Sequence, residues 1–197
     1  RDWSSDVCSS DLGVNAVVNI RQCRIISNST GIAWESMQNG TIENCAIAQN
    51  TSIGLVIDSG ASYSKNCIVR NNEFDSNGST QQVYIDSAEN IELVDNYFVM
   101  NVGALATYQI KVSSNAYYIT LQRNMPRVPN TITGITMYLI GASANYVQIL
   151  NTDWTAWSTS GNTKFNVTNT TSIILDDNEI LRPAARDRKS TRLNSSH

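Results

Sequence analysis

Apolar residues return along this chain in one short pattern. An apolar residue is followed two positions later by another, and three positions after that by Asn, Cys or Thr; a bulky apolar residue often follows two positions on. The polar members of the pattern are Cys23, Cys45, Asn72, Asn96, Asn124, Thr152 and Asn178. They lie about 22 to 28 residues apart, and a period in this range is typical of a protein built from stacked structural repeats.

Each repeat also contains a second apolar pair, with one residue between its members. The last members of these pairs are Trp34, Ile57, Ile85, Val112, Leu139 and Val167. Alternation with a period of two predicts strands with one buried face, and the spacing of an amphipathic helix is absent. Gly and Asn between the apolar segments supply turns. We therefore predict an all-β solenoid of parallel strands with about seven coils of about 22 to 28 residues, in which stacking of the coils buries a continuous core.

The polar member of the pattern is predicted to form the bend between two strands. Asn adopts the left-handed conformation more readily than other residues with a side chain, and stacked Asn side chains can hydrogen-bond from coil to coil as a ladder. We expect this role for Asn72, Asn96, Asn124 and Asn178, with Cys23, Cys45 and Thr152 as small substitutes.

The two ends of the chain are expected not to be native. A DNA string that encodes Arg1–Leu12 has a reverse complement that encodes Asp187–His197, as expected for a sequencing adapter translated at both ends of a read. The β-helix is thus expected to span Gly13–Arg186, as an internal fragment of a longer protein. The single His, His197, lies in the excluded segment.

Composition excludes several classes of function. The chain has 14 Lys and Arg against 17 Asp and Glu, a net charge of −3, and no basic stripe that would indicate a nucleic-acid partner. No apolar run reaches the roughly 18 residues that a membrane span needs. Cys23, Cys45 and Cys67 form neither a CxxC motif nor a metal-binding spacing, so we expect reduced, packed thiols and no resident metal.

The order of strand, turn, alternating strand, Asn bend and short third strand resembles the single-stranded right-handed parallel β-helix of the pectin-lyase-like superfamily. That superfamily includes pectate lyases, polygalacturonases and bacteriophage tailspikes. The resemblance implies an extracellular or virion-surface protein that binds polysaccharide, and a phage tailspike-like glycan hydrolase or lyase is its most natural member. It leaves open whether this chain is an enzyme, because the fold hosts many activities.

The best candidate site lies on the outward face of the strands that end in the second apolar pairs. One residue past the predicted inward positions stand Glu35, Asp58 and Asp86 on three adjacent coils. Carboxyl groups on neighbouring and next-but-one coils are expected about 5 and about 9–10 Å apart, near the separations used in retaining and inverting glycoside hydrolysis. These three residues are the candidate catalytic groups. A Ca²⁺ ion held by the same oxygens, or ordinary hydrogen bonds to the following turns, are the alternatives.

The neighbouring outward column is predicted to bind substrate. It contains Tyr84, Lys111 and Tyr138, where the rings could stack on sugars and the ammonium could pair with an acidic sugar. The main alternative function is a non-catalytic structural or adhesive shaft, which could pack as a homotrimer through Ile140 or Trp157. A Ca²⁺-dependent polyuronate lyase or epimerase ranks lower, because Lys65, Arg70 and Lys111 are the only nearby bases.

Overall fold

The computed structural model describes residues 17–58, 62–78, 80–101, 107–113, 115–129, 131–168 and 173–175. Every regular element in these ranges is a β-strand, and the strands form three parallel sheets. The terminal segments Arg1–Leu12 and Asp187–His197, like Asn178, lie outside the described residues. Within the described part of the chain there is no helix long and apolar enough to span a bilayer.

Sheet A contains seven strands in the order β1 (Val18–Arg21), β4 (Gln38–Glu43), β7 (Ser64–Arg70), β10 (Ala88–Val94), β13 (Tyr117–Gln122), β16 (Asn145–Leu150) and β18 (Ile173–Leu175). Sheet B contains β2 (Arg24–Ile26), β5 (Ala46–Ala48), β8 (Glu73–Asp75), β11 (Tyr97–Val99) and β14 (Met125–Arg127). Sheet C contains β3 (Thr30–Glu35), β6 (Ile53–Asp58), β9 (Gln81–Ile85), β12 (Tyr108–Val112), β15 (Thr136–Ile140) and β17 (Thr163–Val167).

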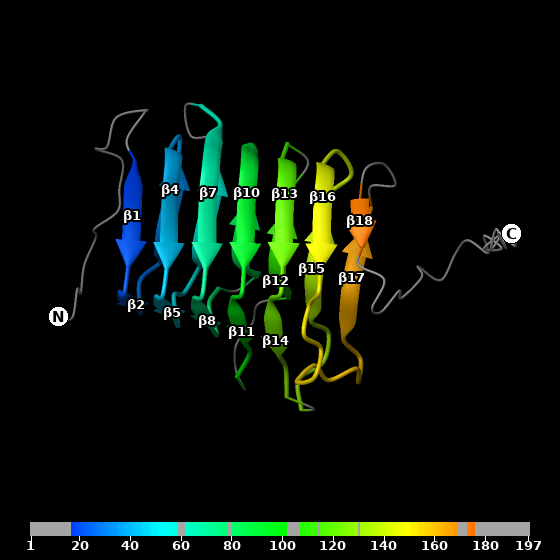
Figure 1. The fold of residues 1–197 in the computed structure, drawn as a ribbon. Helices are drawn as coiled ribbons and strands as arrows, with labels where there is room; N and C mark the ends of the chain where they lie inside the picture. Colours follow the sequence, from blue (N-terminus) through cyan, green and yellow to red (C-terminus); the bar gives the residue numbers. More distant parts are fainter. Residues whose placement is uncertain are drawn as a thin grey trace, which may run out of the picture.

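The chain visits the three sheets in turn, and each visit to all three makes one coil. Figure 1 shows the sheet A strands side by side along an elongated molecule, with the other sheets behind and below them. Five coils contribute a strand to every sheet among the described residues, and two later coils contribute fewer. The predicted all-β parallel solenoid is therefore confirmed, with five complete coils inside the seven rungs of sheet A.

The interior between the sheets is one continuous apolar core. Register pairs such as Ile91 with Ile119 stack like residues on like along sheet A. Phe74 and Phe98 stack in the same way from sheet B, with ring centroids 5.0 Å apart and both side chains fully buried. The apolar side chains of each coil are covered by those of the coils on either side, so the core forms by stacking and not within a single coil.

The predicted Asn ladder is present between sheets A and B. Asn96 Oδ1 accepts hydrogen bonds from the backbone N and Nδ2 of Asn72, each 3.1 Å long. Asn124 Oδ1 accepts the equivalent pair from Asn96 at 3.2 Å. Cys45 continues the column as predicted, since its backbone N donates to Asn72 Oδ1. Both Cys23 and Cys45 carry free thiols, and burial raises the pKa of the Cys45 thiol to about 11.

The bend itself is not formed by the ladder residue. The left-handed residue is the one before it, as in Asn71 (φ 54°), Asp95 (φ 56°) and Arg123 (φ 50°). The expectation that the ladder Asn adopts this conformation is therefore wrong. Placing the bend one residue earlier leaves the ladder side chain pointing inward, where its amide can reach the next coil.

A second amide ladder, which the sequence pattern did not predict, lies between sheets B and C. Asn50 Nδ2 donates to Asn77 Oδ1 at 2.7 Å, and Asn77 Nδ2 donates to Gln82 Oε1 at 3.1 Å. Gln82 Nε2 then donates to Gln109 Oε1. Gly54 makes room for this ladder, because a Cβ there would lie 2.9 Å from the Asn77 side chain.

The prediction of which β15 residues face the core, here called the phase of the strand, is wrong. Ile140, expected to face outward, is fully buried and pairs with Val112, while Tyr138 pairs with Ile110 and is also fully buried. The Tyr138 ring stacks on Phe165 with centroids 5.6 Å apart, and its hydroxyl shares a 2.8 Å hydrogen bond with Thr152 Oγ1. These inward contacts fix the strand in this phase. Trp157, an expected surface contact, is only 7% exposed.

Candidate functional site

The outward face of sheet C brings the three candidate carboxylates into one column. Glu35 pairs directly with Asp58 across β3 and β6. Ile57 pairs with Ile85 on the next coil, so the residues that follow them, Asp58 and Asp86, are also neighbours. The column has this arrangement because Trp34, Ile57 and Ile85 all point into the core, which turns the next residue of each strand outward.

Asp86 is held in place by two hydrogen bonds. The Tyr84 hydroxyl donates to Asp86 Oδ2 at 3.0 Å, and the Ser87 backbone N donates to Asp86 Oδ1 at 2.8 Å. The second bond is the turn contact that was the structural alternative for this residue. The bond from the Tyr84 hydroxyl is not a turn contact. It connects the Asp86 carboxylate to a residue of the neighbouring outward column.

Tyr84 and Lys111 form the rest of the cluster. Lys111 Nζ lies 5.2 Å from the centre of the Tyr84 ring, a cation–π distance. Burial raises the pKa of the Tyr84 hydroxyl, a hydrogen bond to Ser113 opposes that shift, and the nearby Asp86 and Asp58 carboxylates add to it. Ser113 is thus a member of the cluster that the sequence reasoning did not select; it follows Val112 just as Asp86 follows Ile85.

The acidic column does not extend beyond three coils. After Ser113, the register places Gly141 and then Thr168 in the same column, because Val112 pairs with Ile140 and Ile140 with Val167. Within the described residues, no group of three or more His, Cys, Asp or Glu side chains is arranged to hold a metal ion.

The other predicted site residues lie elsewhere. Tyr138 is buried, so its prediction as a sugar platform is wrong; Leu139, not Tyr138, follows Lys111 in the outward column. Lys65 forms a 2.8 Å ion pair with Glu89, and Arg70 pairs with Glu43 at 2.6 Å, both on sheet A. Of the three bases considered for a lyase, only Lys111 lies in the column beside the acids.

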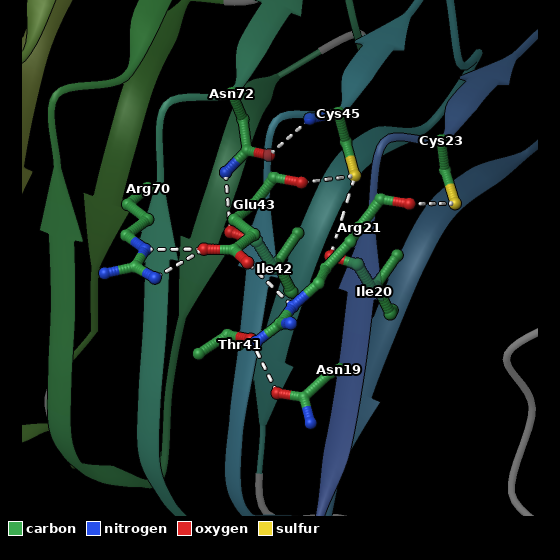
Figure 2. A network of polar contacts seen from close by, with 10 residues as sticks. All are labelled: Asn19, Ile20, Arg21, Cys23, Thr41, Ile42, Glu43, Cys45, Arg70 and Asn72. Carbon is green, nitrogen blue, oxygen red and sulfur yellow. Dashed lines mark hydrogen bonds and ion pairs between the residues drawn. The ribbon is translucent and has the colours of Figure 1, made fainter.

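Sheet A carries a separate polar network on its outward face. Glu43, only 8% exposed, receives Arg21 Nε at 2.7 Å on Oε1 and Arg70 at 2.6 Å on Oε2. Figure 2 shows these side chains on three adjacent coils, beside the thiols of Cys23 and Cys45 and the amide of Asn72. All charges of the network are paired, which marks it as a structural clamp between coils.

A surface pocket of about 300 Å³ lies at another part of the molecule. It is lined by Arg127, Val128, Pro129, Thr155, Ala156, Trp157 and Ser158. None of these residues belongs to sheet C, so the pocket is not a groove over the acidic column.

One comparison with known proteins identifies the family. The family model described as "Right handed beta helix region" matches residues 8–125. No curated protein and no solved structure matches the chain. The family match covers more than half of the chain, and the parallel strands of sheets A and C continue the same architecture to β18. The chain therefore belongs to the right-handed β-helix family.

Proposed function

We propose that this chain is part of an extracellular or virion-associated β-helix protein that binds polysaccharide on the outward face of sheet C. The observation that supports the proposal is the cluster of Tyr84, Asp86 and Lys111, with Asp58 in the adjacent coil. Carboxylates and an ammonium are hydrogen-bonding partners for sugar hydroxyls and acidic sugars, and the aromatic ring provides an apolar surface beside them.

Cleavage of the bound polymer is the more specific form of the proposal. Parallel strands lie about 4.8 Å apart, so the backbones that carry Asp58 and Asp86 lie at about the separation of the carboxyl pair in a retaining glycosidase. Asp86, oriented by Tyr84 and the Ser87 amide, is the better placed of the two to attack or to accept a proton. Asp58 is then the partner acid, and Glu35 extends the acidic surface by one coil.

Cleavage is tested by incubating the purified protein with a panel of capsular and plant polysaccharides. Reducing ends report hydrolysis, and ultraviolet absorbance of unsaturated products reports lysis. We expect Asp86→Asn to lower the rate by about 10²- to 10⁴-fold, the usual effect of losing a proton-transfer group. The matched control is Asp95→Asn at the bend between sheets A and B, which should leave the rate unchanged. Equal rates for the parent and Asp86→Asn would contradict the catalytic role.

A non-catalytic shaft is the second candidate function. Two amide ladders and a continuous core give the molecule the construction of a rigid spacer, and the roughly 300 Å³ pocket is remote from the acids. Binding to polysaccharide without any cleavage would favour this candidate. A homotrimer through Ile140 or Trp157 has lost its basis, because both side chains are buried.

Ca²⁺ at the acidic column is a separate proposal. Its oxygen ligands would have to come from Glu35, Asp58 and Asp86, the residues that share the column. Among the described residues these carboxylates are not arranged as a metal site, so they would have to move together around the ion. Addition of Ca²⁺ should raise the melting temperature of the parent protein but not that of Asp58→Asn, because a ligand that binds only the folded state stabilises it. The same shift in both proteins would place the ion elsewhere.

A further inference from the structure

Five consecutive coils carry a left-handed residue near the start of their sheet A strands. These residues are Asn39 (φ 59°), Asn66 (φ 53°), Asn90 (φ 57°), Tyr118 (φ 56°) and Tyr146 (φ 55°). They lie opposite one another, because the residues on either side of each are register partners from strand to strand. All five side chains are exposed. We call this exposed row the edge column.

The side chains of the edge column contact one another along the molecule. Asn66 Nδ2 donates to Asn39 Oδ1 at 2.8 Å, and Asn90 Nδ2 donates to Asn66 Oδ1 at 3.2 Å. Beyond them, the rings of Tyr118 and Tyr146 stack with centroids 4.7 Å apart and planes 7° from parallel. Three carboxamides thus lead into two phenol rings in one row on the surface.

The backbone does not require tyrosine at these two positions. Asn tolerates the left-handed conformation, whereas a bulky side chain adopts it only at a cost. The three preceding coils, those of β4, β7 and β10, have Asn at the same place, so the coil closes without a ring there. Stacking offsets part of the cost, yet Tyr118 and Tyr146 remain 50% and 54% exposed. Left-handed residues of several types recur along this molecule, so these two positions are set apart by their exposed, stacked rings and not by the backbone conformation.

Further tyrosines extend the edge column into a patch. Tyr117 precedes Tyr118 in the chain, and its ring centroid lies 6.5 Å from that of Tyr63, which is 40% exposed. Four of the eight tyrosines of the chain therefore gather along this edge of sheet A. The adjacent charges, Lys65 and Glu89, form an ion pair 2.8 Å long. The patch is consequently rich in rings, amides and hydroxyls, and its local charge is balanced.

We infer that the edge column and its tyrosine patch bind an uncharged oligosaccharide. Tyrosine supplies rigid contact area at low cost in side-chain entropy, with a hydroxyl at its tip. The amides of Asn66 and Asn90 both donate and accept hydrogen bonds, as sugar hydroxyls do. The balanced charge fits a neutral polymer. This inference shares only its class of ligand with the proposed function, and it uses no residue of sheet C.

The test is native affinity electrophoresis in gels that contain dextran, galactomannan or laminarin, three neutral polysaccharides. The test variant is Tyr118→Asn/Tyr146→Asn, which gives the two coils the residue that the three preceding coils already have, so folding should be preserved. We expect at least one polymer to retard the parent protein, and the double variant to bind it about tenfold or more weakly. Asp58→Asn/Asp86→Asn should be retarded like the parent.

The outcomes separate the two sites. No retardation in any of the three gels, or equal retardation of the parent and the tyrosine double variant, would overturn the inference. A double variant that melts at a lower temperature but binds unchanged would show that the ring stack is purely structural. If only the Asp58→Asn/Asp86→Asn variant loses retardation, neutral glycan binds at sheet C and the inference about the edge column is wrong.

Discussion

Asn96 shows at the scale of one residue how the coils are joined. Its side chain, fully buried, accepts two hydrogen bonds from Asn72 and donates to Val69 O at 2.9 Å and to Asn124 Oδ1 at 3.2 Å. These groups are buried from water, and the Asn72 backbone N has this amide oxygen as its partner. Asn72 Nδ2 also donates to Ile42 O, and Asn124 Oδ1 also accepts from the Asn96 backbone N. The ladder therefore acts as a set of obligatory contacts.

Replacing Asn96 with Ala should destabilise the protein strongly. The change leaves buried donors and acceptors without partners, at about 1–3 kcal/mol each, so we expect a total loss of about 2–4 kcal/mol in the free energy of unfolding. Asn19→Ala is the matched control, because that side chain is exposed and accepts one hydrogen bond, from Thr41 Oγ1. Urea denaturation of both variants measures the difference; similar losses would contradict the role of the buried ladder.

The Tyr84 hydroxyl gives a pH-dependent signal at the candidate site. Burial and the Asp86 and Asp58 carboxylates raise its pKa above the ordinary tyrosine value. The unfolded chain thus loses this proton at lower pH than the folded chain, so the contribution to stability is present below the ordinary value and is lost as pH rises through the raised one. Phenolate absorbance, with Tyr84→Phe as the reference, measures the titration. Asp86→Asn should lower the pKa, and an unchanged value would show that the 3.0 Å contact is not maintained.

The sequence predicted which residues form the first ladder but not which residues bend. Asn72, Asn96 and Asn124 recur as one residue type, because an inward amide links each of these coils to its neighbour. The bend residues Asn71, Asp95 and Arg123 differ in type, since exposed left-handed positions accept several side chains. The second ladder escaped prediction for a related reason: it passes from Asn77 in a turn to Gln82 in a strand, so no fixed spacing marks it.

At the scale of the strand, alternation predicted sheet C well until β15. At the ends of β6 and β9 a polar residue follows the last buried one, and this order fixes which residues face the core. Asp58 and Asp86 were therefore predicted on the correct, outward face. β15 reads Thr-Met-Tyr-Leu-Ile and offers an apolar face in either phase. Packing of Tyr138 between Ile110 and Phe165 decides the phase, and that packing depends on neighbouring coils. One strand alone could not reveal it.

The Glu43 network should couple three strands of sheet A. Glu43 bonds to Arg21 and Arg70 from a nearly buried position, so Glu43→Ala leaves two guanidinium groups facing each other without their shared acid. We expect a loss of about 1–3 kcal/mol in unfolding free energy, the range for charged hydrogen bonds. Asp95→Asn, which removes the charge of the more exposed pair with Arg123 and keeps a residue that tolerates the left-handed bend, should cost less. Thermal melts of both variants test this order, and the reverse order would refute the clamp.

At the scale of the whole molecule, the side chains that stabilise the β-helix and those of the two proposed binding surfaces lie on opposite faces of the strands. The core and the two buried ladders use inward side chains, so the outward columns are free to vary without loss of the fold. The acidic column spans three coils of sheet C, and the edge column spans five coils of sheet A. Both proposed sites require that equivalent residues of successive coils lie side by side. The register of the coils is thus the central claim on which both proposals depend.

Disulfide trapping across sheet A measures that register directly. Glu92 pairs with Thr120, and Thr120 pairs with Gln148, on the outward face. Neighbouring parallel strands lie about 4.8 Å apart, within the Cα range of a disulfide, whereas next-but-one strands lie about 10 Å apart. After mild oxidation, peptide mapping should find the new disulfide in Glu92→Cys/Thr120→Cys and none in Glu92→Cys/Gln148→Cys. A disulfide in the second variant, or its absence from the first, would contradict the coil register.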